Sequence, residues 1–374
     1  MLLQKSSGLF PRILGKGDNA KRLADMLLRM RAEEDVNASS DPTNAYLSAF
    51  GMTPSSVVDN LIIIDREADF PTALLTQLTY EGLIDETFGI RNNQTEVDTS
   101  IIGSAPQQSQ NNTPAPNGTS GGQSVMKRKV QLDSSDKLYP TLRDANFAVV
   151  GPLLNKTARR LQSDYEARHR ADQSISDLKS FVAKLPSYQA EQASLKTHTS
   201  LAEEIMKTTR SSLFSRVLEI QQNFVAGADV SAMHDYIEEL IARAAPLSTI
   251  LRLLCLESSV SNGLRARDLE TFKRAILHAY SHQHLLTFAS LEKAGLLVPK
   301  AANTGYLNPM AGASAGSATD YNAVRKTLRL FVDDVDEADP ADIAYVFSGY
   351  APLSVRIVQC ALQKSYLSLS LIHI

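Results

Sequence analysis

Residues 57–65, VVDNLIIID, contain the clearest β-strand pattern in the chain. Leu61–Ile64 is a run of four leucine or β-branched residues, which is typical of a strand buried on both faces of a parallel sheet. The preceding segment 17–30, GDNAKRLADMLLRM, predicts a helix, because its apolar residues fall on one face and Asp18 or Asn19 can cap its start. A helix followed by a buried strand indicates an α/β unit.

Beyond this strand the sequence predicts helices almost throughout. TALLTQLTYEGLIDE at 72–86 is amphipathic, and longer helical blocks follow at roughly 138–297 and 321–366. No other stretch shows an equally convincing strand pattern. The sequence therefore predicts a mostly α fold with a partial α/β (parallel sheet) remnant.

The overall composition limits the possible functions. The chain has 374 residues, with 38 Lys and Arg against 41 Asp and Glu, for a net charge of −3. This balance argues against a nucleic-acid-binding protein, which normally has a basic excess. The two cysteines cannot form a disulfide framework, and no apolar run is long enough to cross a bilayer. We therefore expect a soluble protein of the cytoplasm.

Two stretches have the composition of loops. Residues 101–124 are rich in Pro, Gly, Ser, Asn and Gln and show no periodicity, so they predict a flexible insertion. Residues 301–320 are rich in small residues and predict a second exposed loop.

Motifs for catalysis or cofactor binding are weak. Gly15-Lys16-Gly17 lacks the spacing and the Ser or Thr of a phosphate-binding loop. His278 and His282 are four residues apart, but no HExxH pattern or nearby cysteine completes a zinc site. We expect no metal, no cofactor and no catalytic residue. Asp65, Arg66 and Asp69 leave two interpretations open: paired carboxylates for acid–base chemistry, or an ion-pair and helix-capping arrangement.

The stretch LIIIDREADFPTALLTQLTYEGLIDETFGI at 61–90 resembles the signature of the Sec/Munc (SM) family, the SNARE-binding proteins of membrane fusion. Residues 76–86 are similar to its vacuolar branch. Three further segments resemble that branch, namely 15–31, 179–205 and 325–357. The resemblance extends over about residues 8–358, whereas family members are longer at both ends, so we expect an incomplete chain.

The resemblance implies a division into domains. Residues 1–66 correspond to part of the α/β second domain of the family, and 67–358 to the helical third domain. Within the latter, a helical hairpin is expected at about 142–195 and a partner-binding subregion at about 240–358. Residues 359–374 are left as an unassigned tail. Its last part, 367–374, matches no family segment, which leaves two interpretations open: foreign, non-native sequence or a wrongly assigned end.

The resemblance also implies a non-enzymatic function, in which the hairpin holds SNARE motifs in register during assembly. The expected partners are R-SNARE and Qa-SNARE proteins. Charge steering of an amphipathic, acidic SNARE helix would use basic and aromatic side chains of the hairpin. These candidates are Lys156, Arg159, Arg160, Tyr165, Arg168 and Arg170.

A second implied surface binds the α-solenoid of vacuolar protein sorting-associated protein 16 within the HOPS and CORVET tethers. Its candidates are Lys273, His282 and Leu285, on an expected helix at 268–288. Membrane contact at the vacuole, lysosome or endosome would then be indirect. An alternative is a tether adaptor that binds the solenoid without templating SNAREs. The structural signature residues are Asp65, Arg66, Asp69, Tyr80 and Asp85.

Overall fold

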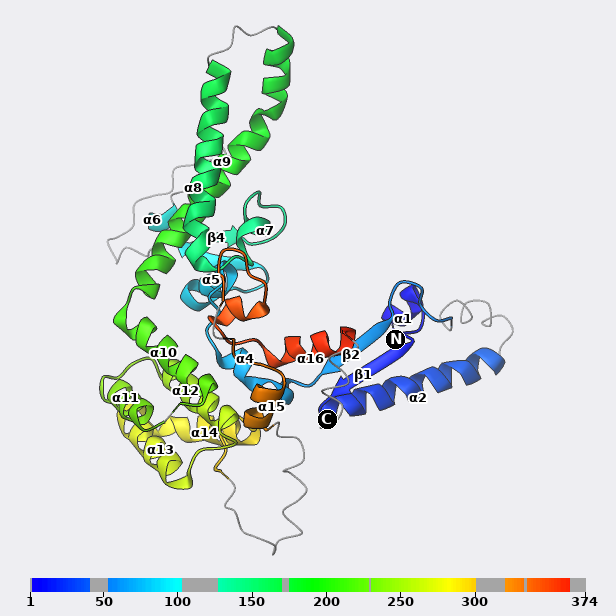
Figure 1. The fold of residues 1–374 in the computed structure, drawn as a ribbon, viewed down its shortest axis with the longest axis vertical. Helices are drawn as coiled ribbons and strands as arrows, with labels where there is room; N and C mark the ends of the chain where they lie inside the picture. The colour runs from blue at the N-terminus through cyan, green and yellow to red at the C-terminus, as the bar shows by residue number, and fades with distance from the viewer. Residues whose placement is uncertain are drawn as a thin grey trace, which may run out of the picture. The chain divides into compact units, whose positions relative to one another are not determined.

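The protein is mostly helical, with two small sheets, which confirms the predicted fold class (Figure 1). The computed structural model describes the following residues: 2–40, 53–102, 127–169, 175–228, 230–300, 320–332 and 335–363. Contacts divide the chain into two compact units. Unit 1 comprises residues 1–75, 220–333 and 350–374, and unit 2 comprises residues 76–219 and 334–349. The boundary predicted after residue 66 stays a prediction.

Unit 1 begins with a small α/β element. After α1 (Leu2–Ser7), strand β1 (Arg12–Lys16) pairs in parallel with β2 (Asn60–Ile64), with α2 (Asp18–Ser40) between them in the chain. The predicted strand is therefore present, and β1 is its unforeseen partner. The expectation that this strand is buried on both faces is wrong, because all five residues of β2 are half-buried.

Helix α2 also differs from its prediction, both in where it ends and in how its start is capped. The helix continues ten residues beyond the predicted end at residue 30. Asp65, which follows β2, provides the acceptor at its N-terminus: the Asp65 Oδ2 atom accepts a hydrogen bond from the Asn19 amide at 3.0 Å. The cap therefore comes from a residue distant in the sequence and not from the side chain of Asp18 or Asn19.

The predicted amphipathic segment 72–86 forms two short helices. After the 3-10 turn η1 (Arg66–Ala68), α4 (Phe70–Leu74) ends at an extended Leu75, and α5 (Tyr80–Phe88) starts with Thr79 as its N-cap. The Thr79 hydroxyl accepts the Gly82 amide at 3.2 Å, which makes the second start locally favourable.

Asp69 connects two helix starts that are far apart in the chain. Its side chain is 2% exposed, and Oδ1 accepts the Thr72 amide of α4 at 3.3 Å. Oδ2 accepts the Thr72 hydroxyl and the Ser354 amide of α16 (Leu353–Leu362), each at 2.8 Å. A buried carboxylate is stable only when such donors satisfy it.

We predict that Asp69→Ala lowers the free energy of unfolding by about 2–3 kcal/mol, because two helix N-termini lose one acceptor. Asp65→Ala, which removes a half-exposed cap, should lower it by about 1 kcal/mol. Denaturant unfolding of the full chain measures both values. Equal effects of the two substitutions would contradict the role given to Asp69.

The remainder of unit 1 is helical. Its centre is α12, which buries apolar side chains on most of its surface. Its helices after the hairpin of unit 2 are the end of α10 (Ser212–Ala226, from residue 220), α11 (Ser231–Ala242), α12 (Leu247–Val260), α13 (Ala266–Tyr280), η2 (His282–His284), α14 (Leu285–Lys293), α15 (Tyr321–Thr327) and α16. The continuous helix expected at 268–288 is wrong: Ser281, at φ 133°, ends α13 and caps η2.

Unit 2 combines a small antiparallel sheet with two long helices. Its elements after α5 are β3 (Gln94–Asp98), α6 (Thr99–Ile102), β4 (Lys127–Gln131), α7 (Tyr139–Leu142), α8 (Phe147–His169), α9 (Ile175–Thr209) and η4 (Ile343–Phe347). Strands β3 and β4 pair from Gln94↔Gln131 to Asp98↔Lys127. Of the predicted insertion 101–124, the first two residues belong to α6 and the others lie outside the described residues, as do 301–319 and the tail from 364.

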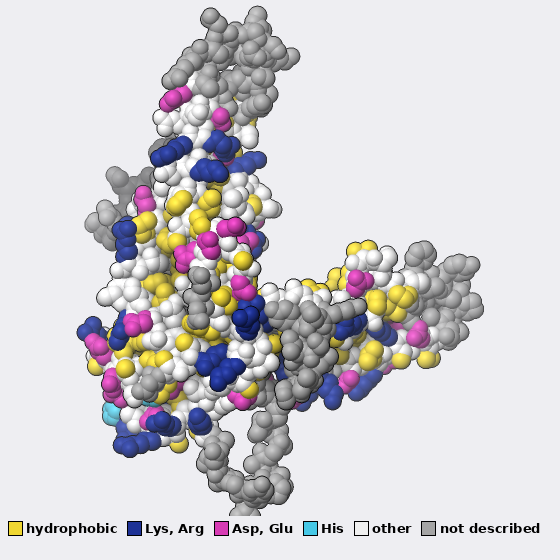
Figure 2. Space-filling model, viewed as in Figure 1, with side chains coloured by type: hydrophobic (Ala, Val, Ile, Leu, Met, Phe, Trp, Pro, Cys, Tyr) yellow, Lys and Arg dark blue, Asp and Glu magenta, His cyan; other side chains and the backbone are white. Residues whose placement is uncertain are grey.

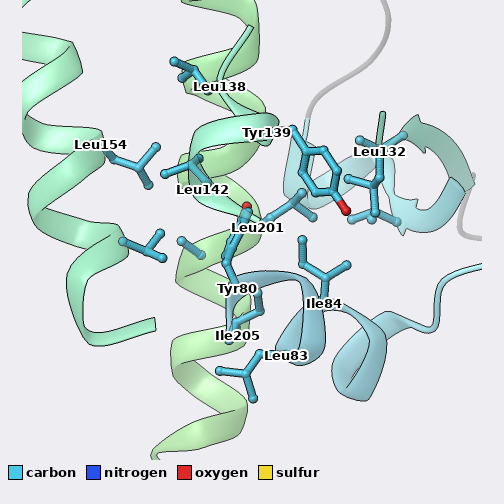
Figure 3. Packing of buried hydrophobic residues seen from close by; sticks show 14 of the residues in the cluster. Tyr80, Leu83, Ile84, Leu132, Leu138, Tyr139, Leu142, Leu154, Leu201 and Ile205 are labelled. Atoms are coloured by element: carbon cyan, nitrogen blue, oxygen red, sulfur yellow. The ribbon is translucent and has the colours of Figure 1, made fainter. Parts of the chain in front are cut away.

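One apolar core joins these elements (Figure 3). Tyr80, Leu83 and Ile84 of α5 pack with Leu201 and Ile205 of α9, and all five are at most 1% exposed. The other buried members of the cluster come from β3, α6, β4, α7, α8 and α9 and from positions next to β4 and α7: Val97, Ile102, Val130, Leu132, Leu138, Tyr139, Leu142, Val150, Leu154 and Ala202. This core fixes the lower parts of α8 and α9 to the rest of unit 2.

Candidate functional site

Helices α8 and α9 form an antiparallel hairpin that extends beyond the core of unit 2 (Figure 1). On α8, Val150, Leu154 and Leu161 recur at helical spacing and are buried, at 0%, 7% and 5% exposed. Their burial gives α8 one apolar face toward the molecule and leaves its other side in solvent.

Two polar contacts join the arms above the core. The Tyr188 hydroxyl of α9 donates to the Leu161 carbonyl of α8 at 3.0 Å, and the Arg160 guanidinium is paired with the Glu191 carboxylate. These contacts fix the rotation of one arm against the other, so that the outward side chains of α8 hold a defined position.

The predicted SNARE-binding residues differ in their environments. Lys156 and Arg159 are exposed on α8, and Tyr165 is 52% exposed. Arg160 is engaged with Glu191 within the hairpin. Figure 2 shows several Lys and Arg side chains grouped on the hairpin.

The two remaining candidates of this set cannot be placed. Arg170 and the side chain of Arg168 lie outside the described residues. The basic surface that the structure describes is therefore formed by the exposed side chains of Lys156 and Arg159.

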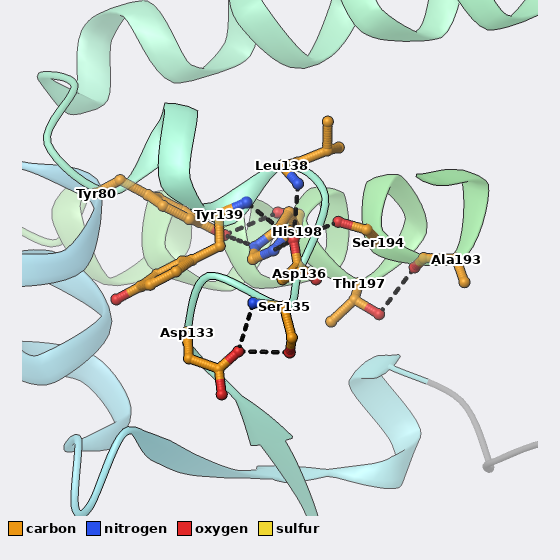
Figure 4. A network of polar contacts seen from close by, with 10 residues as sticks. All are labelled: Tyr80, Asp133, Ser135, Asp136, Leu138, Tyr139, Ala193, Ser194, Thr197 and His198. Atoms are coloured by element: carbon orange, nitrogen blue, oxygen red, sulfur yellow. Dashed lines mark hydrogen bonds and ion pairs between the residues drawn. The ribbon is translucent and has the colours of Figure 1, made fainter. Parts of the chain in front are cut away.

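A polar network lies at the base of the hairpin (Figure 4). Asp136 Oδ1 accepts hydrogen bonds from the Leu138 and Tyr139 amides at 2.8 and 2.9 Å. It also contacts two side chains of α9, the Ser194 hydroxyl at 2.7 Å and His198 Nε2 at 3.2 Å. One carboxylate thus joins the loop before α7 to α9.

His198 extends this network to α5. Its side chain is fully buried, and Nδ1 lies 2.9 Å from the Tyr80 hydroxyl. The Tyr139 ring stacks on the imidazole with ring centroids 6.1 Å apart. His198 Nε2 faces Asp136, and the Tyr80 hydroxyl lies within hydrogen-bond distance of both Nδ1 and the His198 carbonyl oxygen.

Titration of Asp136 follows from these contacts. Partial burial alone would raise its pKa, but hydrogen bonds from His198, Ser194 and the two amides outweigh that effect and hold the pKa well below its usual range. Burial, together with the Asp136 charge, raises the pKa of Tyr80 far above its ordinary value, so this phenol stays protonated. Asp136 is therefore a fixed structural charge beside a neutral Tyr80 hydroxyl.

We predict that Asp136→Asn lowers the free energy of unfolding by about 2 kcal/mol at pH 7, since buried donors lose a charged acceptor. The contribution of Asp136 is fully present above its unfolded pKa of about 3.8 and is lost as the pH falls below that value, because the folded pKa is lower. Unfolding curves between pH 2.5 and 7 measure both effects.

Asp133→Asn is the matched control, because Asp133 lies in the same loop, accepts hydrogen bonds from Ser135 and Gln131, and has no hydrogen bond to α9 among the described residues. Its effect should be much smaller. A loss as large as that of Asp136→Asn would contradict a specific role of Asp136.

Of the second set of predicted residues, Lys273 and Leu285 line a groove between α13 and α14, whereas His282 is not part of its lining. The groove has a volume of about 440 Å³ and is lined by Glu270, Lys273, Arg274, Leu277, Leu285, Phe288, Ala289 and Glu292. Leu285 is 56% exposed, and His282 is exposed on η2. The Lys273 side chain is only 21% exposed and is paired with Glu292 and Glu270.

The signature residues occupy structural positions. Asp65 and Asp69 cap helices as described above, and Arg66 is exposed on η1. Tyr80 belongs to the network of His198, while Asp85 Oδ1 accepts the Ile90 amide at 2.7 Å. None of these contacts places a carboxylate pair around an open cavity.

Asp136, Ser194 and His198 were not predicted as site residues from the sequence. Asp136 is followed after three residues by the start of α7, a spacing typical of a turn-capping Asp, but nothing local indicates its partners 58 and 62 residues away. No cluster of three metal-binding side chains occurs among the described residues. Within that part of the chain, no helix has both the length and the apolarity that a membrane span requires.

Comparison with known proteins identifies the family. The sequence model of the Sec1 family matches residues 1–371 of the chain. The chain belongs to the Sec1 family. This confirms the resemblance to the Sec/Munc proteins that the sequence showed.

Curated relatives of this Sec1-family chain include vacuolar sorting proteins. It is 41% identical over 361 residues to vacuolar protein sorting-associated protein 33A of Rattus norvegicus, covering 96% of this chain and 54% of the relative. It is 35% identical to the Arabidopsis thaliana vacuolar protein-sorting-associated protein 33 homolog, and the alignment covers 97% of this chain and 53% of that relative. The chain thus spans about half the length of the curated relatives it matches.

Solved structures show the same fold at low sequence identity. A chain of the Unc18–syntaxin 1 complex from Monosiga brevicollis matches with a TM-score of 0.59 and 15% identity, covering 96% of this chain and 56% of that one. The SM protein Vps45 matches with a TM-score of 0.53 and 16% identity, and the match covers 76% of this chain and 45% of Vps45.

Proposed function

We propose that this Sec1-family chain is a non-enzymatic SM-type protein that binds SNARE motifs and promotes their assembly. It would act in vesicle docking and fusion at the vacuole or lysosome and at endosomes, as a subunit of the HOPS and CORVET tethers. The main support is the hairpin, whose arms are fixed to each other while Lys156 and Arg159 point to solvent. The names of the vacuolar sorting relatives agree with the site of action.

A hairpin of this kind suits an amphipathic helical ligand. SNARE motifs have apolar layers flanked by acidic residues, so a helix docking along α8 would meet the exposed Tyr165 and the basic side chains of Lys156 and Arg159. Complementary charge mainly increases the association rate and fixes the register.

The expected ligands are R-SNARE and Qa-SNARE proteins. The related SM protein Vps45 has been solved in complex with the Qa SNARE Tlg2, and Unc18 in complex with syntaxin 1. Both complexes concern distant relatives, and we extend them to this chain as part of the proposal. No cofactor or metal is required for such binding.

We predict that Lys156→Glu/Arg159→Glu weakens binding of a vacuolar R-SNARE motif by about tenfold or more, because two attractive charges become repulsive. Fluorescence anisotropy of the labelled motif with the full chain, at 50 and 200 mM salt, measures this. Arg160 is left unchanged because its reversal would also break the pair with Glu191.

Lys21→Glu/Lys326→Glu is the control, since both lysines are exposed in unit 1 and the net charge changes equally. It should bind the motif as the unaltered chain does. If both double variants weaken binding to the same degree, net charge and not the hairpin surface determines the affinity.

A second candidate function is that of a tether adaptor alone. The supporting observation is the groove between α13 and α14, where Leu285 remains 56% exposed beside the apolar side chains of Leu277 and Phe288. An exposed leucine beside apolar side chains in a groove with a charged rim is typical of a helix-docking surface. The proposed occupant is the α-solenoid of vacuolar protein sorting-associated protein 16.

We predict that Leu285→Asp abolishes capture of the solenoid, whereas Leu286→Asp, at a neighbouring position that is 78% exposed and not part of the groove lining, leaves it intact. A pull-down with the full chain measures this. Solenoid binding without any SNARE binding by the unaltered chain would favour the adaptor function over templating.

A further inference from the structure

His234 of α11 lies between acidic side chains from two other helices. Its Nε2 atom is 2.7 Å from Glu257 Oε1 of α12, and its Nδ1 atom is 4.0 Å from Asp268 Oδ2 of α13. The imidazole also contacts the Phe272 ring of α13 edge to face, with centroids 5.1 Å apart. Three helices of unit 1 thus meet at one titratable ring.

The protonation state of His234 matters because the Glu257 carboxylate beside it is buried. The Glu257 side chain is 5% exposed, and its Oε2 atom has no hydrogen-bond partner among the described residues. A neutral imidazole has one N–H and can donate to Glu257 alone, whereas an imidazolium donates to Glu257 and also attracts the Asp268 carboxylate 4.0 Å from Nδ1. Protonation therefore decides whether α13 is linked electrostatically to α11 and α12.

The other charges nearby act in opposite directions. Arg265, just before α13, opposes a positive charge on His234, whereas Glu257 and Asp268 favour it. On α11 itself, Asp235 and Glu238 are exposed to solvent. The two carboxylates that face the ring therefore outnumber the one cation.

Helix α13 also forms one wall of the groove described above. Leu269, Phe272 and Ile276 are buried on one of its faces, while Glu270, Lys273 and Leu277 line the groove. A change in how firmly α13 is held against α11 and α12 would change the spacing between α13 and α14.

We propose that His234 is a proton-dependent clamp that fixes α13 against α11 and α12 and thereby sets the shape of the groove. The clamp is closed when the imidazole is protonated and loosens when it loses its proton. The clamp itself rests on the geometry of unit 1, and only its effect on a docked partner rests on the proposed function.

The titration of His234 agrees with this geometry. The hydrogen bond with Glu257 raises its pKa, burial opposes the rise, and the charges of Glu257 and Asp268 add to it. Because the folded pKa lies above the unfolded value of 6.5, the stabilisation is complete below about pH 6.5 and is lost as the pH rises through the folded pKa.

The test is a histidine NMR titration of the full chain, combined with amide hydrogen exchange of α13 corrected for intrinsic rates. We expect His234 to titrate above pH 6.5, and Asp268→Asn to lower that value. As the pH rises through the folded pKa of His234, the hydrogen-exchange protection of α13 should fall. The total fall should be about tenfold for each unit by which the folded pKa exceeds the unfolded one. His278→Gln, an exposed position on the same helix, should behave as the unaltered chain.

His234→Gln should remove the pH dependence of α13 protection. Unchanged pH dependence in His234→Gln, or an unchanged His234 pKa in Asp268→Asn, would overturn the clamp. If His234→Gln does not fold, Asp268→Asn alone decides the question. A normal titration with no solenoid binding at any pH would instead count against the proposed tether function and leave the clamp standing.

Discussion

The carboxylate of Asp136 is the contact on which the candidate site depends. It accepts hydrogen bonds from two backbone amides at the start of α7 and contacts Ser194 and His198 of α9. His198 in turn contacts the Tyr80 hydroxyl of α5. A partly buried charge is favourable only when several donors satisfy it, so the carboxylate admits one arrangement of these elements. The base of the hairpin is therefore fixed. Contacts between α8 and α9 hold its outer part in position.

The two proposed surfaces differ physically. Lys156 and Arg159 of the hairpin face solvent and suit long-range attraction of an acidic helix. In the groove, by contrast, Lys273 is paired with Glu292 and Glu270, and the exposed Leu285 offers apolar area. A partner there would gain mainly from burying apolar surface, with binding less sensitive to salt.

Local sequence patterns predicted the elements that depend on local interactions. Strand β2 was predicted because Leu61–Ile64 is strongly β-prone, whereas β1 contains Gly15 between charged ends and gave no signal. Strands β3 and β4 are five residues each, and β4 begins with three consecutive basic residues and buries only Val130, so the pair shows little apolar alternation. The Asp136–His198 contact spans 62 residues, and its partners are single polar residues, so tertiary packing alone brings them together.

The central claim is that α8 and α9 receive a SNARE helix. Hydrogen-exchange mass spectrometry of the full chain, with and without a saturating R-SNARE motif, tests it most directly. The account predicts slower exchange on ligand addition in α8 around residues 153–165 and in the facing part of α9, with α13 and α14 unchanged. Protection confined to α13 and α14, with the hairpin unaffected, would contradict it.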